Sequence, residues 1–270
     1  PADAGVERPR PAGGTGGHVM PALAVADALR ARGAEVAFVG PGRGGAAARV
    51  REAGYRHHAV PMRGLARRLT PRNLWAIALA AAATPRAAYV LARRRAQVVI
   101  GAGGYAAGPV ALAAWVTRRP LVLMEADSHM GAANRLAAPL ARRVALAFPL
   151  PGRTGRKYEV TGRPVARAVV EATRTSGRRA FGIPPDATVV LVVGGSQGAR
   201  TLNVAAVEAF GDGAPLRVIH VAGPGQVEEA RRLLGPGAEG DGYRLVGWLD
   251  NLHEAIAAAD LVVSRAGGSV

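Results

Sequence analysis

Three glycine-rich segments are the first candidates for a chemical role: residues 13–17, 101–104 and 194–198. Each is expected at the carboxyl end of a strand and just before a helix. Glycines there let backbone N–H groups approach a phosphate closely, and the positive end of the following helix attracts its charge. The same glycines would also suit a tight strand-to-helix turn that binds nothing.

The spacing of these segments narrows the class of phosphate compound. None has the dinucleotide fingerprint with an acidic residue about 20 positions later, and none continues into the Lys-Ser/Thr of an ATP-binding loop. The pattern therefore disfavours NAD and ATP. Two nucleotide-type domains, each with such a segment, suit a reaction that joins a sugar nucleotide to a second phosphorylated substrate.

Acid–base candidates stand beside two of the glycine segments. His18 directly follows the first, and Glu125 and Asp127 end the apolar run that starts at Pro120. Imidazole is the side chain whose ordinary pKa lies closest to neutrality, so His18 is the first candidate for a general base. Glu125 and Asp127 are its rivals. Alternatively, His18 caps the turn and the two acids cap the next helix.

Composition restricts the partners. The chain has 35 basic and 19 acidic residues, a net charge of +16, which predicts attraction to polyanions such as an anionic membrane surface or a nucleic acid. No aromatic–basic interleaving or nucleic-acid motif accompanies the charge, so we expect no nucleic-acid partner. Without cysteine, disulfides and zinc–thiolate sites are excluded. With no Asp-x-Asp pair and no close His/acid cluster, we expect no metal.

Strands that alternate with helices predict the fold. In the first part, strands are expected over residues 35–40, 55–62, 97–100, 120–128, 141–149 and 158–164, with helices over 17–33, 71–95 and 105–115. In the second part, four further strands are expected within 188–193, 216–223, 243–251 and 260–270. This order predicts the α/β class, with two Rossmann-like, doubly wound parallel sheets.

The segment 158–164, a short strand followed by Gly and Pro, is where the first sheet is expected to end. We therefore predict domains at residues 1–162 and 163–270. The chain starts at Pro1 and stops at Val270, just after a glycine pair in a predicted strand-to-helix turn, so we expect the second domain to be incomplete. The best apolar run, Leu74 to Ala83, is about half the roughly 20 residues of a spanning helix, so we expect no membrane crossing.

Four segments, in this order, resemble the MurG-type N-acetylglucosaminyltransferases: GGTGGHVMPALAVADAL, GAGGYAAGPVALAAW, LMEADS and GGSQGARTLN. The resemblance covers nearly the whole chain. It implies a GT-B fold, two Rossmann-like domains that face a cleft, with an N-terminal domain for acceptor and membrane and a C-terminal domain for the UDP-sugar.

The implied reaction is an inverting transfer of N-acetylglucosamine in peptidoglycan synthesis. The donor is UDP-GlcNAc, and the acceptor is the muramyl C4 hydroxyl of undecaprenyl-pyrophosphoryl-MurNAc-pentapeptide, so that lipid I becomes lipid II. No cofactor is implied besides this donor substrate. The enzyme is expected on the cytoplasmic face of the cell membrane, as a peripheral protein.

The resemblance also assigns substrate-binding positions, with Ser196 to Gly198 as the donor diphosphate loop: Thr15, Gly16, Gly17, Tyr105, Asn134, Ser196, Gln197, Gly198, Asn203 and Leu249. A cation is implied at Arg163 or Arg167, and the choice stays open. Where the family has His-Glu-Gln-Asn, this chain has Met124-Glu125-Ala126-Asp127, which makes the acceptor-side chemistry less closely matched.

The helix over residues 71–95 is a candidate membrane surface. Its apolar residues Leu74, Trp75, Ile77 and Leu79, with Trp115 on another helix, are flanked by Arg67, Arg68, Arg72, Arg86 and Arg93 to Arg95. Apolar side chains ringed by cations suit a helix lying on an anionic bilayer. An ordinary core helix with solvated ends is the alternative, and the lipid acceptor implied by the resemblance favours the membrane.

Two other functions stay open. A UDP-sugar epimerase would use the same fold but would need no lipid-binding surface. A basic membrane-binding fragment without activity is the second alternative, and we expect the fragment as given to be inactive on its own.

Overall fold

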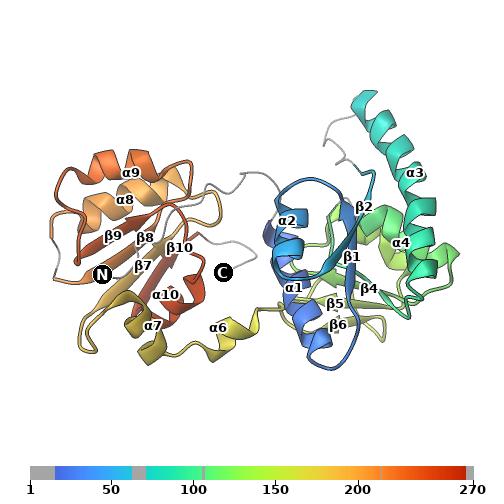
Figure 1. Cartoon of the computed structure of the whole chain (residues 1–270), viewed down its shortest axis with the longest axis horizontal. Coiled ribbons are helices and arrows are strands. Elements are labelled where there is room, and N and C mark those ends of the chain that lie inside the picture. Colours follow the sequence, from blue (N-terminus) through green and yellow to red (C-terminus); the bar gives the residue numbers. More distant parts are fainter. Residues whose placement is uncertain (1–15, 63–70, 105–106, 214, 266–270) are drawn as a thin grey trace. The chain divides into compact units, whose positions relative to one another are not determined.

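The computed structural model describes residues 16–62, 71–104, 107–213 and 215–265 of the chain (Figure 1). Its contacts divide the chain into two compact units, Pro1–Ala166 and Arg167–Val270. This division falls after Ala166, whereas the sequence placed the domain boundary after residue 162, so the structure groups Arg163 with the first unit.

The first unit contains two sets of parallel strands. In the described residues, β1 (Ala37–Pro41) and β2 (Arg56–Val60) pair with each other. A four-stranded sheet has the order β3-β4-β5-β6, from Val99–Gly101, Leu121–Glu125, Arg143–Leu146 and Tyr158–Val160. The helices are α1 (Gly16–Arg30), α2 (Gly45–Glu52), α3 (Pro71–Arg93), α4 (Ala107–Val116) and α5 (Ala132–Ala137), with a 3-10 turn, η1, at Ala138–Leu140.

The core of the first unit lies between the four-stranded sheet and the helices beside it. Alanines on α4, which have no long side chain to hold the helix off its neighbours, are fully buried against leucine and valine side chains of β4 and β5. This packing closes a core although only 4% of the chain is aromatic. Because the strands are parallel, the turns that follow β3 and β4 meet at one edge of the sheet.

The second unit is a four-stranded parallel sheet covered on both faces. Its strand order is β10-β7-β8-β9, from Leu261–Ser264, Val189–Val193, Arg217–Val221 and Tyr243–Val246. The helices are α6 (Arg167–Glu171), α7 (Arg174–Phe181), α8 (Arg200–Phe210), α9 (Val227–Leu234) and α10 (Leu252–Ala258).

The strand side chains of this unit alternate between two cores. Val190, Val192 and Val218 point to the face that α8 and α9 cover. Val189, Leu191 and other alternate residues point to the opposite face, where Phe181 of α7 and Ala255 of α10 pack. Figure 1 shows α8 and α9 together on one side of this sheet and α7 and α10 on the other. The predicted doubly wound parallel fold is therefore confirmed.

Each of the ten strands predicted from residue 35 onward has a counterpart among the described residues, and most are shorter than expected. The strand expected just before residues 13–17 lies outside the described residues. The strand predicted over residues 120–128, for example, ends at Glu125, because the chain turns there to enter α5. The short helices α2, α5, α6, α7, α9 and α10 were not predicted from the sequence.

Candidate functional site

The first candidate site lies at the edge of the four-stranded sheet, on the turn after β3. His18, in the first turn of α1, is half-buried there. A Cβ placed on Gly103 would lie 3.1 Å from His18 Nδ1, and one on Gly104 would lie 3.6 Å from His18 Cδ2. Both glycines have left-handed backbones, with φ of 85° and 71°. The glycine turn thus forms the surface against which the imidazole rests.

Asn134, from α5, lies beside the same turn. Its amide nitrogen is 3.5 Å from the position of the added Gly103 Cβ, and it donates to Met124 O (2.9 Å) and Glu125 Oε2 (3.0 Å). Within the described part of the chain, His18 Nδ1 and Asn134 Oδ1 are buried without a hydrogen-bond partner. Since buried polar atoms are nearly always paired, two such atoms beside one turn indicate a place for a polar group of a ligand, or for water.

The two carboxylates predicted as rival bases have different surroundings. The Glu125 side chain is buried and accepts hydrogen bonds from Gly131 N (2.8 Å), Asp127 N (3.2 Å) and Asn134. It therefore closes the turn between β4 and α5 and fixes the orientation of the Asn134 amide. Asp127 lies in the same turn and is only half-buried.

The two candidate cations are also placed differently. Arg163 Nη1 donates to Ala126 O at 2.8 Å, which brings this guanidinium to the turn that holds Glu125 and Asp127. Arg167, on α6 of the second unit, is exposed and pairs with Glu171 at 2.6 Å. Arg163 is thus the cation that the structure places beside the acidic turn.

The second candidate site is the turn between β7 and α8, residues 194–198. Ser196 and Gln197 are exposed at this turn, whereas Gly198 is buried against the chain that follows β8. A Cβ on Gly198 would lie 1.8 Å from Ala222 O, and Gly198 has a φ of 74°. The N-cap residue of α8 is Ala199, and in the described part of the chain this position makes no side-chain cap hydrogen bond at the positive end of the helix. The turn can therefore present backbone amides and a helix N-terminus to a phosphate.

Beneath this turn lies a buried polar group that the sequence analysis missed. His220 of β8 is 0% exposed, and its ring nitrogens contact Tyr243 Oη (2.8 Å) and Asn203 Oδ1 (3.0 Å). Burial lowers the pKa of His220 to about 4 and raises the pKa of Tyr243. The one sequence signal was a histidine inside the otherwise apolar run of a buried strand.

Thr15 and Tyr105 lie outside the described residues, and Gly16 and Gly17 begin α1. Leu249 is half-buried and packs against the core on the side of α7 and α10.

Asn203 was predicted to contact substrate, but its amide is buried and bonded within the protein. The amide nitrogen donates to Ala222 O (2.9 Å) and Gln226 Oε1 (3.1 Å), and the amide oxygen contacts His220. The structure therefore gives Asn203 a place beneath the turn that carries Ser196 and Gln197.

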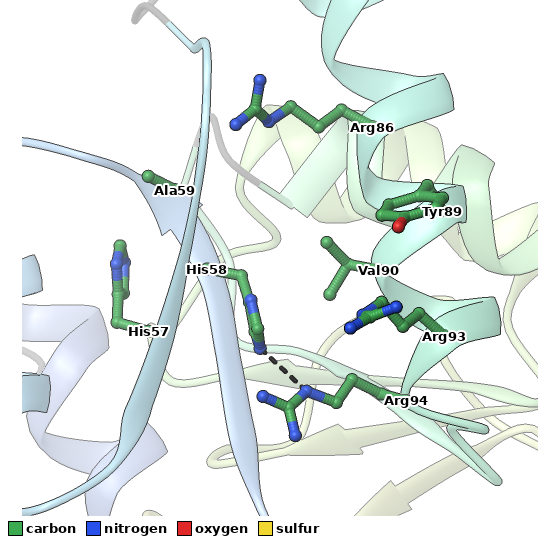
Figure 2. A pocket seen from close by; sticks show the side chains of 8 residues that line it. All are labelled: His57, His58, Ala59, Arg86, Tyr89, Val90, Arg93 and Arg94. Atoms are coloured by element: carbon green, nitrogen blue, oxygen red, sulfur yellow. Dashed lines mark hydrogen bonds between the residues drawn. The ribbon is translucent and has the colours of Figure 1, made fainter.

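A basic cavity of about 520 Å³ lies between β2 and α3 in the first unit. Figure 2 shows arginine side chains of α3 on one side and the two histidines of β2 on the other. The lining residues are His57, His58, Ala59, Arg86, Tyr89, Val90, Arg93 and Arg94.

The electrostatics of this cavity favour an anion. Arg94 Nε donates to His58 Nε2 at 3.1 Å, so His58 is neutral and accepts through that nitrogen (Figure 2). Burial and then the charge of Arg94 and Arg56 lower the pKa of His58, and burial and Arg51 do the same for His57. Arg94 Nη1 lies 3.6 Å from the Glu35 carboxylate, so the excess positive charge of the cavity comes mainly from Arg86 and Arg93, and an anionic ligand would relieve it.

Exposed apolar and aromatic side chains lie on the two helices near this cavity, which pack against each other. Tyr89 of α3 is 63% exposed, and Trp115 of α4 is 59% exposed. The side chains of Leu74, Trp75, Ile77 and Leu79 lie outside the described part of the structure, as do Arg67, Arg68 and the side chain of Arg72. Among the described residues, no helix is both long enough and apolar enough to span a bilayer.

The described residues also bear on metal binding. No group of three or more His, Cys, Asp or Glu side chains there could hold a metal ion.

Parallel sheets flanked by helices in both units, each with a glycine turn at the end of a strand, define a protein of the Rossmann-like class. Within that class, the chain belongs to glycosyltransferase family 28. The N-terminal domain of the family matches residues 11–146, and the C-terminal domain matches residues 189–270.

Two curated relatives carry the name UDP-N-acetylglucosamine–N-acetylmuramyl-(pentapeptide) pyrophosphoryl-undecaprenol N-acetylglucosamine transferase. The protein from Acidithiobacillus ferrooxidans is 41% identical over 261 residues, which is 96% of this chain and 71% of that protein. The one from Nitrosococcus oceani is 41% identical over 259 residues, 95% of this chain and 71% of that protein.

Solved structures agree on the fold. MurG from Acinetobacter baumannii matches with a TM-score of 0.68 and 27% identity, over 95% of this chain and 72% of that protein. A UDP-GlcNAc 2-epimerase from Neisseria meningitidis, bound to UDP-GlcNAc, has a TM-score of 0.60 but 13% identity, over 93% of this chain and 75% of that protein. The second likeness shows a shared fold alone.

Proposed function

We propose that this protein transfers N-acetylglucosamine from UDP-GlcNAc to the muramyl C4 hydroxyl of undecaprenyl-pyrophosphoryl-MurNAc-pentapeptide. The observation that carries this proposal is the 41% identity, over 96% of the chain, to a transferase of that name. The epimerase of the same fold is far less similar, at 13% identity. The reaction is a step of peptidoglycan synthesis, and its product is lipid II.

His18 is the base of this reaction. Its imidazole takes the proton of the C4 hydroxyl as that oxygen attacks the anomeric carbon of the donor sugar. The bond from that carbon to the diphosphate oxygen breaks, UDP leaves with the electron pair, and the configuration at carbon inverts. Support comes from the half-buried position of His18 on the glycine turn and from its Nδ1, which lacks a partner among the described residues.

Asn134 and Arg163 bind the acceptor. Asn134 has a buried amide oxygen without a described partner beside His18, which suits a sugar hydroxyl. Arg163 reaches the β4–α5 turn, where a guanidinium can meet the acceptor diphosphate. Glu125 holds Asn134 in place through its hydrogen bonds, and Asp127 is the alternative base, because its carboxylate is less buried.

The β7–α8 turn holds the donor diphosphate. Ser196 and Gln197 are exposed there, and the N-terminus of α8 offers amides and the positive end of its dipole. Phosphate charge can be balanced by these groups, so we propose that no metal takes part. In this scheme, the first unit, up to Ala166, binds the acceptor, and the second unit, from Arg167, binds the UDP-sugar.

The first unit contacts the cytoplasmic face of the membrane through α3 and α4. The arginines of the basic cavity suit anionic headgroups, and the exposed Tyr89 and Trp115 suit the boundary between headgroups and acyl chains. This contact would hold the site at the depth where the sugar of a lipid-linked acceptor lies.

The test is an assay with UDP-GlcNAc and a lipid I analogue, run on the protein at its full natural length. We expect UDP release that depends on the acceptor and a disaccharide product. Release of UDP or conversion of the sugar without acceptor, with the 2-epimer among the products, would support an epimerase instead. Binding to anionic vesicles without any turnover would support the inert membrane-binding alternative.

A further inference from the structure

A continuous chain of side-chain hydrogen bonds runs from the core of the second unit to the β7–α8 turn. It begins at Tyr243 on β9 and passes through His220 on β8 and Asn203 on α8. From Asn203 it continues to Gln226 Oε1 (3.1 Å), and Gln226 Nε2 reaches the backbone oxygen of Gln197 at 2.9 Å. The four side chains thus connect β9, β8 and α8 to one carbonyl of the turn.

Donor and acceptor chemistry fixes the direction of every bond in this chain. Gln197 O can only accept, so Gln226 must present its amide nitrogen to it and its oxygen to Asn203. Asn203 then donates from nitrogen, and its oxygen accepts from His220 Nε2–H. His220 is therefore the neutral tautomer with hydrogen on Nε2, and its Nδ1 accepts from the Tyr243 hydroxyl.

The hydrogen-bond chain also holds the opposite side of the turn. Asn203 donates its second amide hydrogen to Ala222 O at 2.9 Å. That carbonyl is the atom against which Gly198 packs, where an added Cβ would lie 1.8 Å away. The amide of Asn203 thus fixes both places where the turn meets the β8–α9 segment. It acts on Gln197 by way of Gln226, and it bonds Ala222 directly.

An apolar side chain would be the ordinary choice at position 220. Its partners on the adjacent strands, Val192 and Leu245, and Val218 two residues before it are apolar and buried. A buried imidazole costs desolvation, and its removal by an apolar residue would leave Asn203 Oδ1 buried and unpaired. The histidine is therefore explained by the amide that it orients.

We propose that His220, acting through Asn203 and Gln226, is a positioning residue that sets the backbone of residues 196–198 for the donor diphosphate. The inference rests on the proposed function, because the ligand of the turn is the diphosphate of the UDP-sugar. His220 does not touch that ligand. It acts on donor binding, while the proposed base, His18, lies in the other unit and is unaffected.

The experiment compares His220→Leu with His220→Gln in the protein at its full natural length. Gln can place its amide nitrogen near the position of imidazole Nε2 and keep the donor to Asn203, whereas Leu fills space only. We expect His220→Leu to raise both the KM for UDP-GlcNAc and the Kd for UDP roughly tenfold, the effect of one unpaired buried polar group. The kcat at saturating donor should change much less, and His220→Gln should recover most of the affinity.

The control is His253→Leu, which removes a histidine from α10 of the same unit and should leave KM and Kd unchanged. The inference is wrong if folded His220→Leu binds UDP like the wild type, or if Gln restores no more affinity than Leu. If His220→Leu does not fold, the Kd for UDP is measured for Gln226→Leu, at the accessible end of the hydrogen-bond chain. A raised Kd supports the inference, and an unchanged Kd overturns it. A wild type that binds UDP without transferring sugar overturns the proposed transfer alone, since the Kd comparison still tests His220.

Discussion

Acidification should destabilise the second unit through His220. Its pKa falls from the ordinary 6.5 to about 4 because the ring is fully buried, so the folded protein keeps it neutral while the unfolded chain protonates. The stability that the neutral ring supplies is complete above pH 6.5 and is lost as the pH falls toward 4. Linkage over this interval gives a loss of about 2 kcal/mol at pH 5 relative to pH 7.

The assay is urea unfolding at pH 7 and pH 5, in which hydrogen exchange of peptides from β7 and β8 measures the unfolding. These peptides report on the second unit and leave out His57 and His58, whose pKa values are also lowered but which lie in the first unit. His220→Gln cannot titrate, so it should lose about 2 kcal/mol less than the wild type over the same interval. Equal losses would refute the view that His220 is buried as the neutral ring.

Four further outcomes test the sites. His18→Ala should lower kcat by about 10² to 10⁴ with little change in UDP affinity; near-normal kcat would transfer the role of base to Asp127 or Glu125. Gly198→Ala should raise the Kd for UDP, measured by calorimetry, because the added Cβ would lie 1.8 Å from Ala222 O at a φ of 74°. An unchanged Kd would contradict the packing of this turn. The double variant Arg86→Ala with Arg93→Ala should bind anionic vesicles roughly 30-fold more weakly in a sedimentation assay, a loss of about 2 kcal/mol of binding free energy. The double variant Arg179→Ala with Arg232→Ala removes the same charge from the second unit and should change vesicle affinity much less. EDTA should leave the transfer rate unchanged, and loss of activity restored by Mg²⁺ would contradict the metal-free proposal.

Local patterns predicted the parallel sheets because their strands are short apolar runs. In β7, for example, four of the five residues are buried, and the run Val-Val-Leu-Val-Val reads as a strand without any knowledge of its neighbours. The helix α2, in contrast, consists largely of Ala and Arg and has only Ala47 and Val50 buried, so it lacks an apolar period that a sequence could reveal.

Site residues were predictable one by one, but their contacts were not. His18 and Glu125 could be chosen by residue type and by position after a glycine segment or a strand. That His18 rests on Gly103, and that Glu125 bonds the Asn134 amide, depends on strands β3 and β4 being neighbours in the sheet. His220 was missed for the same reason, because Asn203 and Tyr243 reach it only through the parallel register of β8 and β9 and the placement of α8.

The fixed direction of the hydrogen-bond chain restricts how this part of the protein can evolve. The hydrogen-bond chain ends on the backbone carbonyl of Gln197, which no substitution can turn into a donor. Every side chain in the series must therefore keep its donor and acceptor in the same order. Asp at position 203 would set its carboxylate against Gln226 Oε1, and a flipped Gln226 would only move that clash to Gln197 O. Positions 203, 220 and 226 should therefore vary together across related sequences, with lineages that lose the histidine also replacing the asparagine.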